Sequence, residues 1–475
     1  MMKKHTTRSR RKIAILCSYI SGESYGMLGP QMAATVIQEN APFDAIVVAV
    51  TREDDKGILK KALSDFFGSQ PPVIGFSTLS GREDLFELAR ELKDEGAFTL
   101  LAGPQARADY LGEEGWRDHP HRFPGLRRHF TCALQGPAEQ AVPLLLGMDT
   151  GRWKDTQGLL CPGDGDEIIH TPRKEWETEY LNAVKWDNLY RLHGDALVPL
   201  QVTTGQVLQQ IGCPHAAKDK MIEIDYPATL AGEQPEKVAI RLRGCSFCDV
   251  ARDKGFFGAL DMATVLAQVL CLPEGKDGRK IPFELINENP LPGLPRLLKE
   301  TREKRIPLSQ INLILRADWL LKGKKHLKES LILARDMGLR ILLVSVGFES
   351  FDDKILHNLH KGLDSGTNLE AIRLMRRIKE VFPQEFDYDR TRGAVHGFIH
   401  PTPWDNEDTS AQIQKVINIY GLPRDILPEH SIPLIIHHAS GLGEWIREIE
   451  KREKVLFKRY GSTIGWWSIE KRHTV

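Results

Sequence analysis

Short apolar segments alternate with longer amphipathic segments over the first 147 residues of the chain. The apolar segments contain four to six residues, which is typical of buried strands, and the segments between them have helical spacing. Strands are expected at residues 13–18, 45–50, 73–77, 98–102 and 131–134, and helices at residues 28–39, 58–67, 82–95 and 139–146. This alternation predicts an α/β domain with a doubly wound parallel sheet, of the flavodoxin-like or Rossmann-like kind.

A second strand and helix series begins at residue 200. Strands are expected at residues 207–211, 238–242, 283–286, 311–315, 341–346, 394–399 and 432–437, and helices at residues 261–270, 294–304, 325–337, 369–382 and 409–420. Repeated βα units in one run predict a partial barrel of the TIM type with six such units. We expect residues 238–242 to run back beside residues 207–211.

The remaining segments divide the chain. The expected order is a disordered tail at residues 1–11, the first domain at 12–149, a polar linker at 150–199, the barrel at 200–441 with an insertion at 217–237, and a helical tail at 442–475.

Composition and charge narrow the functional classes. Hydrophobic residues make up 41% of the chain and charged residues 27%, which is an ordinary globular balance. Lys plus Arg and Asp plus Glu each number 64, so the net charge of 64 − 64 = 0 gives no indication of nucleic-acid binding. No apolar run is long enough to span a membrane, and the apolar stretch at 13–17 is too short for a signal peptide. We expect a cytoplasmic protein.

Cysteine usage indicates where the chemistry lies. The seven cysteines are sparse and odd in number, which argues against a disulfide framework. Cys245 and Cys248 form the only C-x-x-C pair, and two-residue spacing lets both sulfurs reach one metal or cluster. The pair alone is also compatible with buried or redox-active thiols, or with half of a zinc site. A zinc site would need a matching second pair, which the sequence does not offer.

The surroundings of the cysteines resemble the radical S-adenosylmethionine enzymes. That family binds a four-iron cluster through a G-C-P-x-x-C-x-F-C type of loop. Here Gly-Cys-Pro at residues 212–214 and Gly-Cys-Ser-Phe-Cys at residues 244–248 resemble two halves of one loop. An insertion separates Cys213 from Cys245 by 245 − 213 − 1 = 31 residues. The resemblance implies that Cys213, Cys245 and Cys248 hold a [4Fe-4S] cluster, with one iron left open for S-adenosylmethionine.

Further segments of residues 207–436 resemble the family's strand ends. They include Gly347-Phe-Glu349-Ser350, then Lys361-Gly362, and the Gly397 to Pro403 loop. The resemblance implies that S-adenosylmethionine contacts Phe247, Asn287, Glu288, Arg316, Glu349 and Ser350. Taken singly, Glu349-Ser350 is also compatible with a helix cap, and 287–289 with an ordinary turn. His396, His400, His437 and His438 lie near strand ends and are either substrate-side acids and bases or polar core neighbours.

The first domain resembles the cobalamin-binding domains that precede such barrels. The implied cobalamin contacts are Ser77, Thr78, Leu79, Gly103, Pro104, Gln105, Gly136 and Glu139. No His lies between His5 and His119, so the loop that supplies a cobalt-ligating His in methionine synthase is missing, and cobalamin would bind without that ligand. A doubly wound domain that binds no ligand is the alternative.

Together, the resemblances imply an enzyme that forms a 5′-deoxyadenosyl radical and transfers a methyl group from cobalamin to an unactivated carbon. The alternatives are a radical rearrangement, cyclisation or oxidation without methyl transfer, or a non-catalytic iron–sulfur or corrinoid-binding protein. The expected partners are a small-molecule or peptide substrate and an electron donor such as flavodoxin or ferredoxin, with no membrane.

Overall fold

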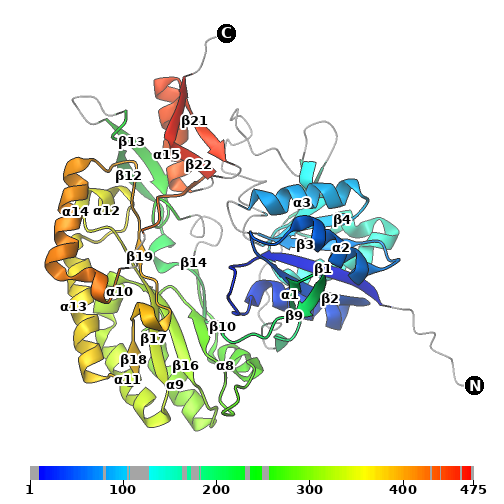
Figure 1. Ribbon diagram of the computed structural model, residues 1–475, viewed down its shortest axis with the longest axis horizontal. Coiled ribbons are helices and arrows are strands. Elements are labelled where there is room, and N and C mark those ends of the chain that lie inside the picture. The colour runs from blue at the N-terminus through cyan, green and yellow to red at the C-terminus, as the bar shows by residue number, and fades with distance from the viewer. Residues whose placement is uncertain are drawn as a thin grey trace, which may run out of the picture. The chain divides into compact units, whose positions relative to one another are not determined.

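The chain forms two compact units, residues 1–203 and 204–475, and each is considered by itself. The computed structural model (Figure 1) describes residues 10–78, 82–103, 106, 128–162, 168–172, 181, 183–230, 236–248, 256–427, 431–438, 440–460 and 463–471.

The first unit is built on one mixed sheet. Its strands are β1 (Arg11–Ser18), β2 (Phe43–Val50), β3 (Val73–Ser77), β4 (Phe98–Ala102), β5 (Cys132–Leu134), β6 (Leu159–Pro162), β7 (Ile168–His170), β8 (Leu189–His193) and β9 (Ala196–Pro199). They lie in the order β7-β6-β5-β4-β3-β1-β2-β8-β9. Every neighbouring pair in the stretch β5-β4-β3-β1-β2-β8 is parallel. The order of β1 to β5 is that of flavodoxin-like folds, which confirms the expected α/β unit with a parallel sheet.

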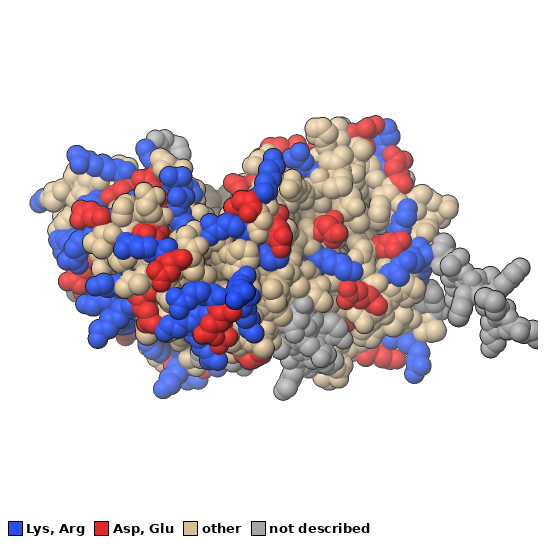
Figure 2. Space-filling model, turned by 90° about the horizontal axis from the view of Figure 1, so that it is seen from below, with Lys and Arg blue, Asp and Glu red and all other residues tan. Residues whose placement is uncertain are grey.

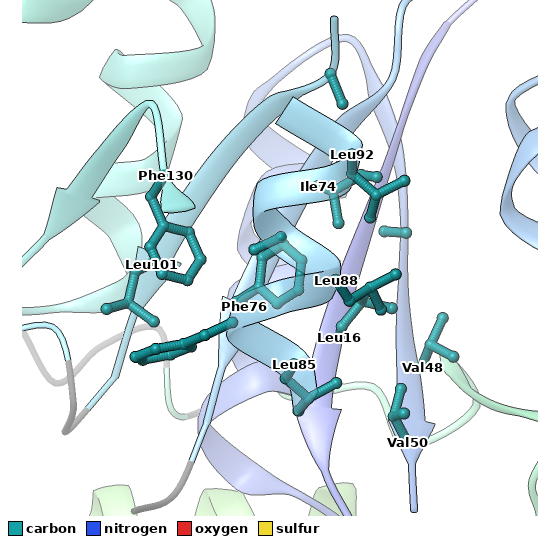
Figure 3. Close-up of a cluster of buried hydrophobic side chains, with 14 of the residues drawn as sticks. Leu16, Val48, Val50, Ile74, Phe76, Leu85, Leu88, Leu92, Leu101 and Phe130 are labelled. Atoms are coloured by element: carbon teal, nitrogen blue, oxygen red, sulfur yellow. The ribbon is translucent and has the colours of Figure 1, made fainter. Parts of the chain in front are cut away.

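Helices cover the sheet of the first unit. They are α1 (Leu28–Asn40), α2 (Lys56–Phe67), α3 (Glu83–Asp94) and the short α6 (Ala141–Gly147). Leu85, Leu88 and Leu92 repeat at helical spacing, so they share the face of α3 that packs on Leu16 and Ile74 of the sheet (Figure 3). Burial of each leucine contributes about 1.5–3 kcal/mol, and this packing keeps the carboxyl ends of the strands in place.

The segment expected to be a linker, residues 150–199, differs from that expectation. It contributes β6 and β7 to one edge of the sheet and β8 and β9 to the other. These strands have three to five residues, and β7 and β9 are the two edge strands of the sheet. Such short segments become strands because an existing sheet offers hydrogen-bonding partners, and their periodicity is too weak to read in the sequence.

The second unit has six parallel strands. They are β10 (Gly205–Leu208), β15 (Phe283–Ile286), β16 (Gln310–Arg316), β17 (Arg340–Glu349), β18 (Phe386–Asp387) and β19 (Gly397–Phe398). The order is β10-β15-β16-β17-β18, and β19 also pairs with β17. Within the described residues no pairing joins β10 to β18, so the sheet is open there. The expected strand at 432–437 is reduced to a single parallel bridge between Ile399 and Ile432, followed by the two residues of β20 (Ile436–His437).

Helices pack along one side of these strands (Figure 1). They are α8 (Met262–Cys271), α9 (Leu294–Glu303), α10 (Ala317–Lys322), α11 (Lys324–Met337), α12 (Asp353–Asn358), α13 (Ser365–Val381) and α14 (Glu407–Tyr420). In the described part of the chain, no helix combines the length and apolar character needed to cross a membrane. Basic and acidic side chains are intermixed on the face seen in Figure 2.

Two expectations about this unit are wrong in detail. Residues 238–242 lie in β13 (Lys237–Leu242), which forms an antiparallel hairpin with β12 (Lys220–Asp225) and does not pair with β10. The 207–211 region instead continues into β11 (Gln210–Gly212), which pairs with β14 (Phe256–Ala259). The C-terminal tail is helical only in α15 (Gly441–Glu453), because the alternating, aromatic-rich segment after it forms β21 (Val455–Tyr460) and β22 (Thr463–Lys471).

Candidate functional site

The carboxyl ends of the parallel strands in the second unit carry most of the predicted site residues. Asn287 and Glu288 follow β15, Arg316 ends β16, and Glu349 ends β17. Because parallel neighbours end at the same edge of a sheet, these residues share one edge. This is the edge at which βα barrels bind their ligands.

The β12–β13 hairpin explains how the two cysteine segments meet. Its last pair joins Lys220 to Leu242, and beyond that pair Asp219 accepts a 2.5 Å hydrogen bond from Arg243. The hairpin from 220 to 242 contains 242 − 220 + 1 = 23 residues, so only 31 − 23 = 8 of the intervening residues lie outside it. The insertion therefore leaves the site and returns to nearly the same point.

Both cysteine segments are bound to the residues that follow α12. The ring Nε2 of His215, two residues after Cys213, donates to the main-chain oxygen of His360 at 3.0 Å. The ring Nδ1 of His360 donates to the oxygen of Gly244, directly before Cys245, at 2.6 Å.

Ser246 attaches the second segment to the same place. Its backbone N–H donates to the oxygen of Leu359 at 3.0 Å, and its hydroxyl donates to the oxygen of Asn358 at 2.8 Å. Ser246 is fully buried, and the Cys248 N–H closes the turn onto the Cys245 oxygen at 3.2 Å. The Cys245–Cys248 turn is thus held by three residues in a row, 358–360.

The thiols of Cys213 and Cys245 both have raised pKa values. Burial raises the pKa of Cys213, and Glu288 and Cys245 raise it further, while the backbone N–H groups of His215 and Ala216 lower it. Burial also raises the pKa of Cys245, opposed by nearby cations. Glu288 raises the pKa of both thiols.

Arg316 connects the cysteine turn to the strand ends. Its Nη1 lies 3.5 Å from the Cys245 sulfur, its Nε donates to Asp318 at 3.0 Å, and its Nη2 donates to the oxygen of Lys361. The residue is only 7% exposed, so its charge is poorly screened by solvent. Together with Lys361 it lowers the pKa of Cys245, but burial outweighs both cations, so the net shift of the pKa is upward.

Glu349 is held by Lys361 in a buried ion pair. Oε2 of Glu349 and Nζ of Lys361 are 3.0 Å apart, and the two side chains are 11% and 4% exposed. Burial lowers the pKa of Lys361, but Glu349 and Cys245 outweigh it, so the net shift is upward. A Cβ at residue 347 would lie 2.8 Å from Glu349 Oε1, so a larger residue there would displace the carboxylate from its present position.

Three other predicted S-adenosylmethionine contacts lie in turns, and two of them make hydrogen bonds to nearby residues of the protein. Asn287 donates to Gln209 at 2.8 Å and accepts from the Asn289 N–H at 2.8 Å. Ser350 is fully buried, and its hydroxyl accepts from the Asp352 N–H at 3.1 Å, as in a local turn. Phe247 is half-buried in the turn between the two cysteines.

The donor set suits an iron–sulfur cluster. Cys213, Cys245 and Cys248 are half-buried and form no disulfide, whereas Cys271 ends α8 at the opposite, amino end of the strands. No group of three or more His, Cys, Asp or Glu in the described residues is arranged around a single ion. Ligands of a cluster surround several metal atoms and are spread more widely. Two cations beside Cys245, and a Cys213 segment bound to the same residue as the Cys245 segment, fit this group.

Sequence reasoning missed His360 and Gln209 as site residues. His360 stands in the Leu-His-Lys-Gly segment that resembles the family, but the resemblance gave no role to the histidine, and Gln209 follows an apolar strand. Their roles could not be predicted, because each acts through a contact with a segment far away in the chain.

The predicted cobalamin contacts that the structure describes lie at or just beyond the carboxyl ends of β3, β4 and β5. A Cβ at residue 103 would lie 2.9 Å from Ser77 Oγ, and Gly103 has a φ of +79°, so this close approach needs glycine. Thr78 and Glu139 are buried, and Gly136 has a φ of +108°. Leu79, Pro104 and Gln105 lie outside the described residues.

Gln135, directly after β5, offers one observation on the fit of a ligand there. The side chain is 4% exposed, and its Nε2 has no hydrogen-bond partner among the described residues. A buried amide is normally satisfied, so a polar acceptor is expected at this edge. A ligand with polar groups, such as the cobalamin tail, fits these residues.

Comparison with known proteins supports the fold. No protein-family model matches the sequence, and no curated protein does. A solved structure of OxsB in its apo form, described as a cobalamin-dependent S-adenosylmethionine radical enzyme, is similar to 96% of this chain with a TM-score of 0.56 and 10% sequence identity. The match spans 64% of that chain's length. The chain therefore shares the fold of a cobalamin-dependent S-adenosylmethionine radical enzyme.

Proposed function

We propose that this protein is a radical S-adenosylmethionine enzyme whose [4Fe-4S] cluster is held by Cys213, Cys245 and Cys248. The observation that carries the proposal is that two cysteine segments, 31 residues apart, are bound to the same residue at the carboxyl edge of a parallel sheet. The fold shared with OxsB supports the same reading.

When bound, the cluster and S-adenosylmethionine would supply a 5′-deoxyadenosyl radical by reductive cleavage of a C–S bond. The chain's own residues bind and orient. Arg316 and Lys361 offset the negative charge of the thiolates, and Glu349 and Glu288 present carboxylates to the amino group of S-adenosylmethionine. Phe247 supplies an apolar surface for adenine, while Asn287 and Ser350 shape the strand ends around it. The electron would come from a partner such as flavodoxin or ferredoxin.

Methyl transfer to an unactivated carbon is the reaction proposed for the whole protein. It requires cobalamin at the carboxyl edge of the first unit, where Ser77, Gly103 and Gly136 permit close approach of a bulky ligand. The orphan amide of Gln135 favours a bound ligand over an empty structural domain. A radical rearrangement, cyclisation or oxidation without methyl transfer is the second candidate, because the cysteine site would support it without cobalamin.

Anaerobic reconstitution tests the cluster. We expect about four irons and four sulfides per chain, with the electron paramagnetic resonance of the reduced cluster altered by added S-adenosylmethionine. Cys213→Ala, Cys245→Ala and Cys248→Ala should each lose the S-adenosylmethionine effect, and Cys271→Ala should keep it. Stoichiometric zinc without iron would refute the proposal, as would an unchanged cluster in Cys213→Ala.

Cobalamin binding is tested separately on the full chain. Hydroxocobalamin should remain bound through gel filtration with a spectrum that shows no histidine ligand to cobalt. If cobalamin separates from a chain that still cleaves S-adenosylmethionine, methyl transfer is excluded and the second candidate stands.

A further inference from the structure

The cysteine site has an uncommon connectivity. Cys245 and Cys248 share one turn, but Cys213 reaches them only through the 23-residue β12–β13 hairpin. A short covalent link would hold three thiols together by itself. A hairpin does so only if its base is held closed, because its arms can separate by a few ångström without breaking the chain.

His360 bridges the two arms with both its side chain and its main chain. Its Nδ1–H donates to Gly244 O at 2.6 Å on the Cys245 side, and its own oxygen accepts from His215 Nε2 at 3.0 Å on the Cys213 side. The two imidazole rings lie 5.4 Å apart. Because both acceptors are carbonyl oxygens, the donor nitrogen of each ring must carry the proton.

The backbone at His360 is adapted to this position. Its φ is +48°, a left-handed conformation that non-glycine residues adopt infrequently. The preceding Asn358 and Leu359 oxygens accept from Ser246, so the segment carrying His360 is itself attached to the cysteine turn. The strained conformation aims the ring at Gly244 while the oxygen faces His215.

We infer that His360 is a positioning residue of the cysteine site, which ties the Cys213 segment to the Cys245–Cys248 turn in place of a short covalent link. This inference rests on the proposed function, in that the three thiols share a cluster. His360 itself is not a ligand. Its role is to limit the separation of thiols that a hairpin insertion has divided.

Three variants separate this role from a general effect on folding. His360→Gly removes the ring donor and suits a positive φ. His360→Asn also tolerates a positive φ and keeps an N–H donor at the position of Nδ1, so it should rescue the site. His357→Ala, at an exposed position in the last turn of α12, removes a neighbouring imidazole and serves as the control.

The first measurement is the rate at which a chelator removes iron from the anaerobically reconstituted protein. We expect His360→Gly to lose iron at least about tenfold faster than wild type, which is the usual effect of removing a hydrogen bond that positions metal ligands. His360→Asn and His357→Ala should lose iron at close to the wild-type rate. The unfolding midpoints of the metal-free proteins should stay close together. Equal rates for His360→Gly and wild type, or equal losses in His360→Gly and His360→Asn, would overturn the inference.

A second measurement uses the metal-free protein and therefore does not depend on the cluster. Phenylarsine oxide binds two converging thiols, so in a Cys248→Ser background it reports whether Cys213 and Cys245 meet. We expect His360→Gly or, should that variant not fold, His215→Ala to reduce arsenical binding about tenfold. A wild-type chain that binds the arsenical but no iron refutes the proposed function alone, whereas arsenical binding unaffected by these substitutions refutes the role of His360.

Discussion

Replacing Lys361 by Met should destabilise the second unit strongly, because it leaves the Glu349 carboxylate buried without its cation. Nζ and Oε2 are 3.0 Å apart, and neither side chain is more than 11% exposed. Breaking a buried pair from one side costs about 3–5 kcal/mol, whereas an exposed pair is worth at most about 1 kcal/mol. Met fills a similar volume, so the loss is attributable to the charge.

The double variant Lys361→Met/Glu349→Gln isolates this cause. A neutral amide needs no cation, so the double variant should regain most of the stability lost by the single one.

Hydrogen exchange of the β16 and β17 amides in increasing urea follows the second unit alone. With an m-value of about 3 kcal/mol/M, the expected loss lowers the midpoint by about 1 M or more. A loss below about 1 kcal/mol in Lys361→Met would show that solvent compensates the carboxylate. A double variant as unstable as the single one would assign the effect to packing.

Three further predictions concern other parts of the chain. Gly103→Ala should destabilise the first unit more than Gly96→Ala does in urea unfolding. Both glycines have positive φ, so each substitution introduces about 1 kcal/mol or more of backbone strain, but only a Cβ at residue 103 would also approach Ser77 Oγ. Equal losses of stability would contradict this prediction. Burial lowers the pKa of His396, so the unfolded chain binds a proton below about pH 6.5 while the folded chain does not, and stability should fall as the pH drops below this value. His396→Gln should flatten the pH dependence of stability measured by urea titration. An unchanged slope would rule out His396 as its source. Arg316→Lys should weaken S-adenosylmethionine binding in equilibrium dialysis about tenfold, because three nitrogens of Arg316 serve three different partners; unchanged binding would assign Arg316 a purely structural role.

The local pattern of the chain predicted the elements that have strong periodicity of their own. The strands near residues 13–18, 73–77 and 341–346, and the helices between them, occur as expected because each presents a continuous apolar face or run. The same pattern could not identify β6 to β9, the outer two strands at each end of the first sheet, or the two-residue β18. Those segments depend on hydrogen bonds to a sheet that is already in place, and their own side chains carry little of that information.

The sequence by itself determined which residues are chemically capable of forming the site: the C-x-x-C pair, the glycine before Cys213, and the polar residues after successive strands. Only the tertiary structure decided how Cys213 is brought toward Cys245. It did so through the pairing of β12 with β13 and through His360, whose hydrogen bonds reach 145 residues back to His215 and 116 back to Gly244. Contacts over such separations depend on the packing of the whole unit, because neither partner changes the local hydrophobic pattern from which sequence predictions are made.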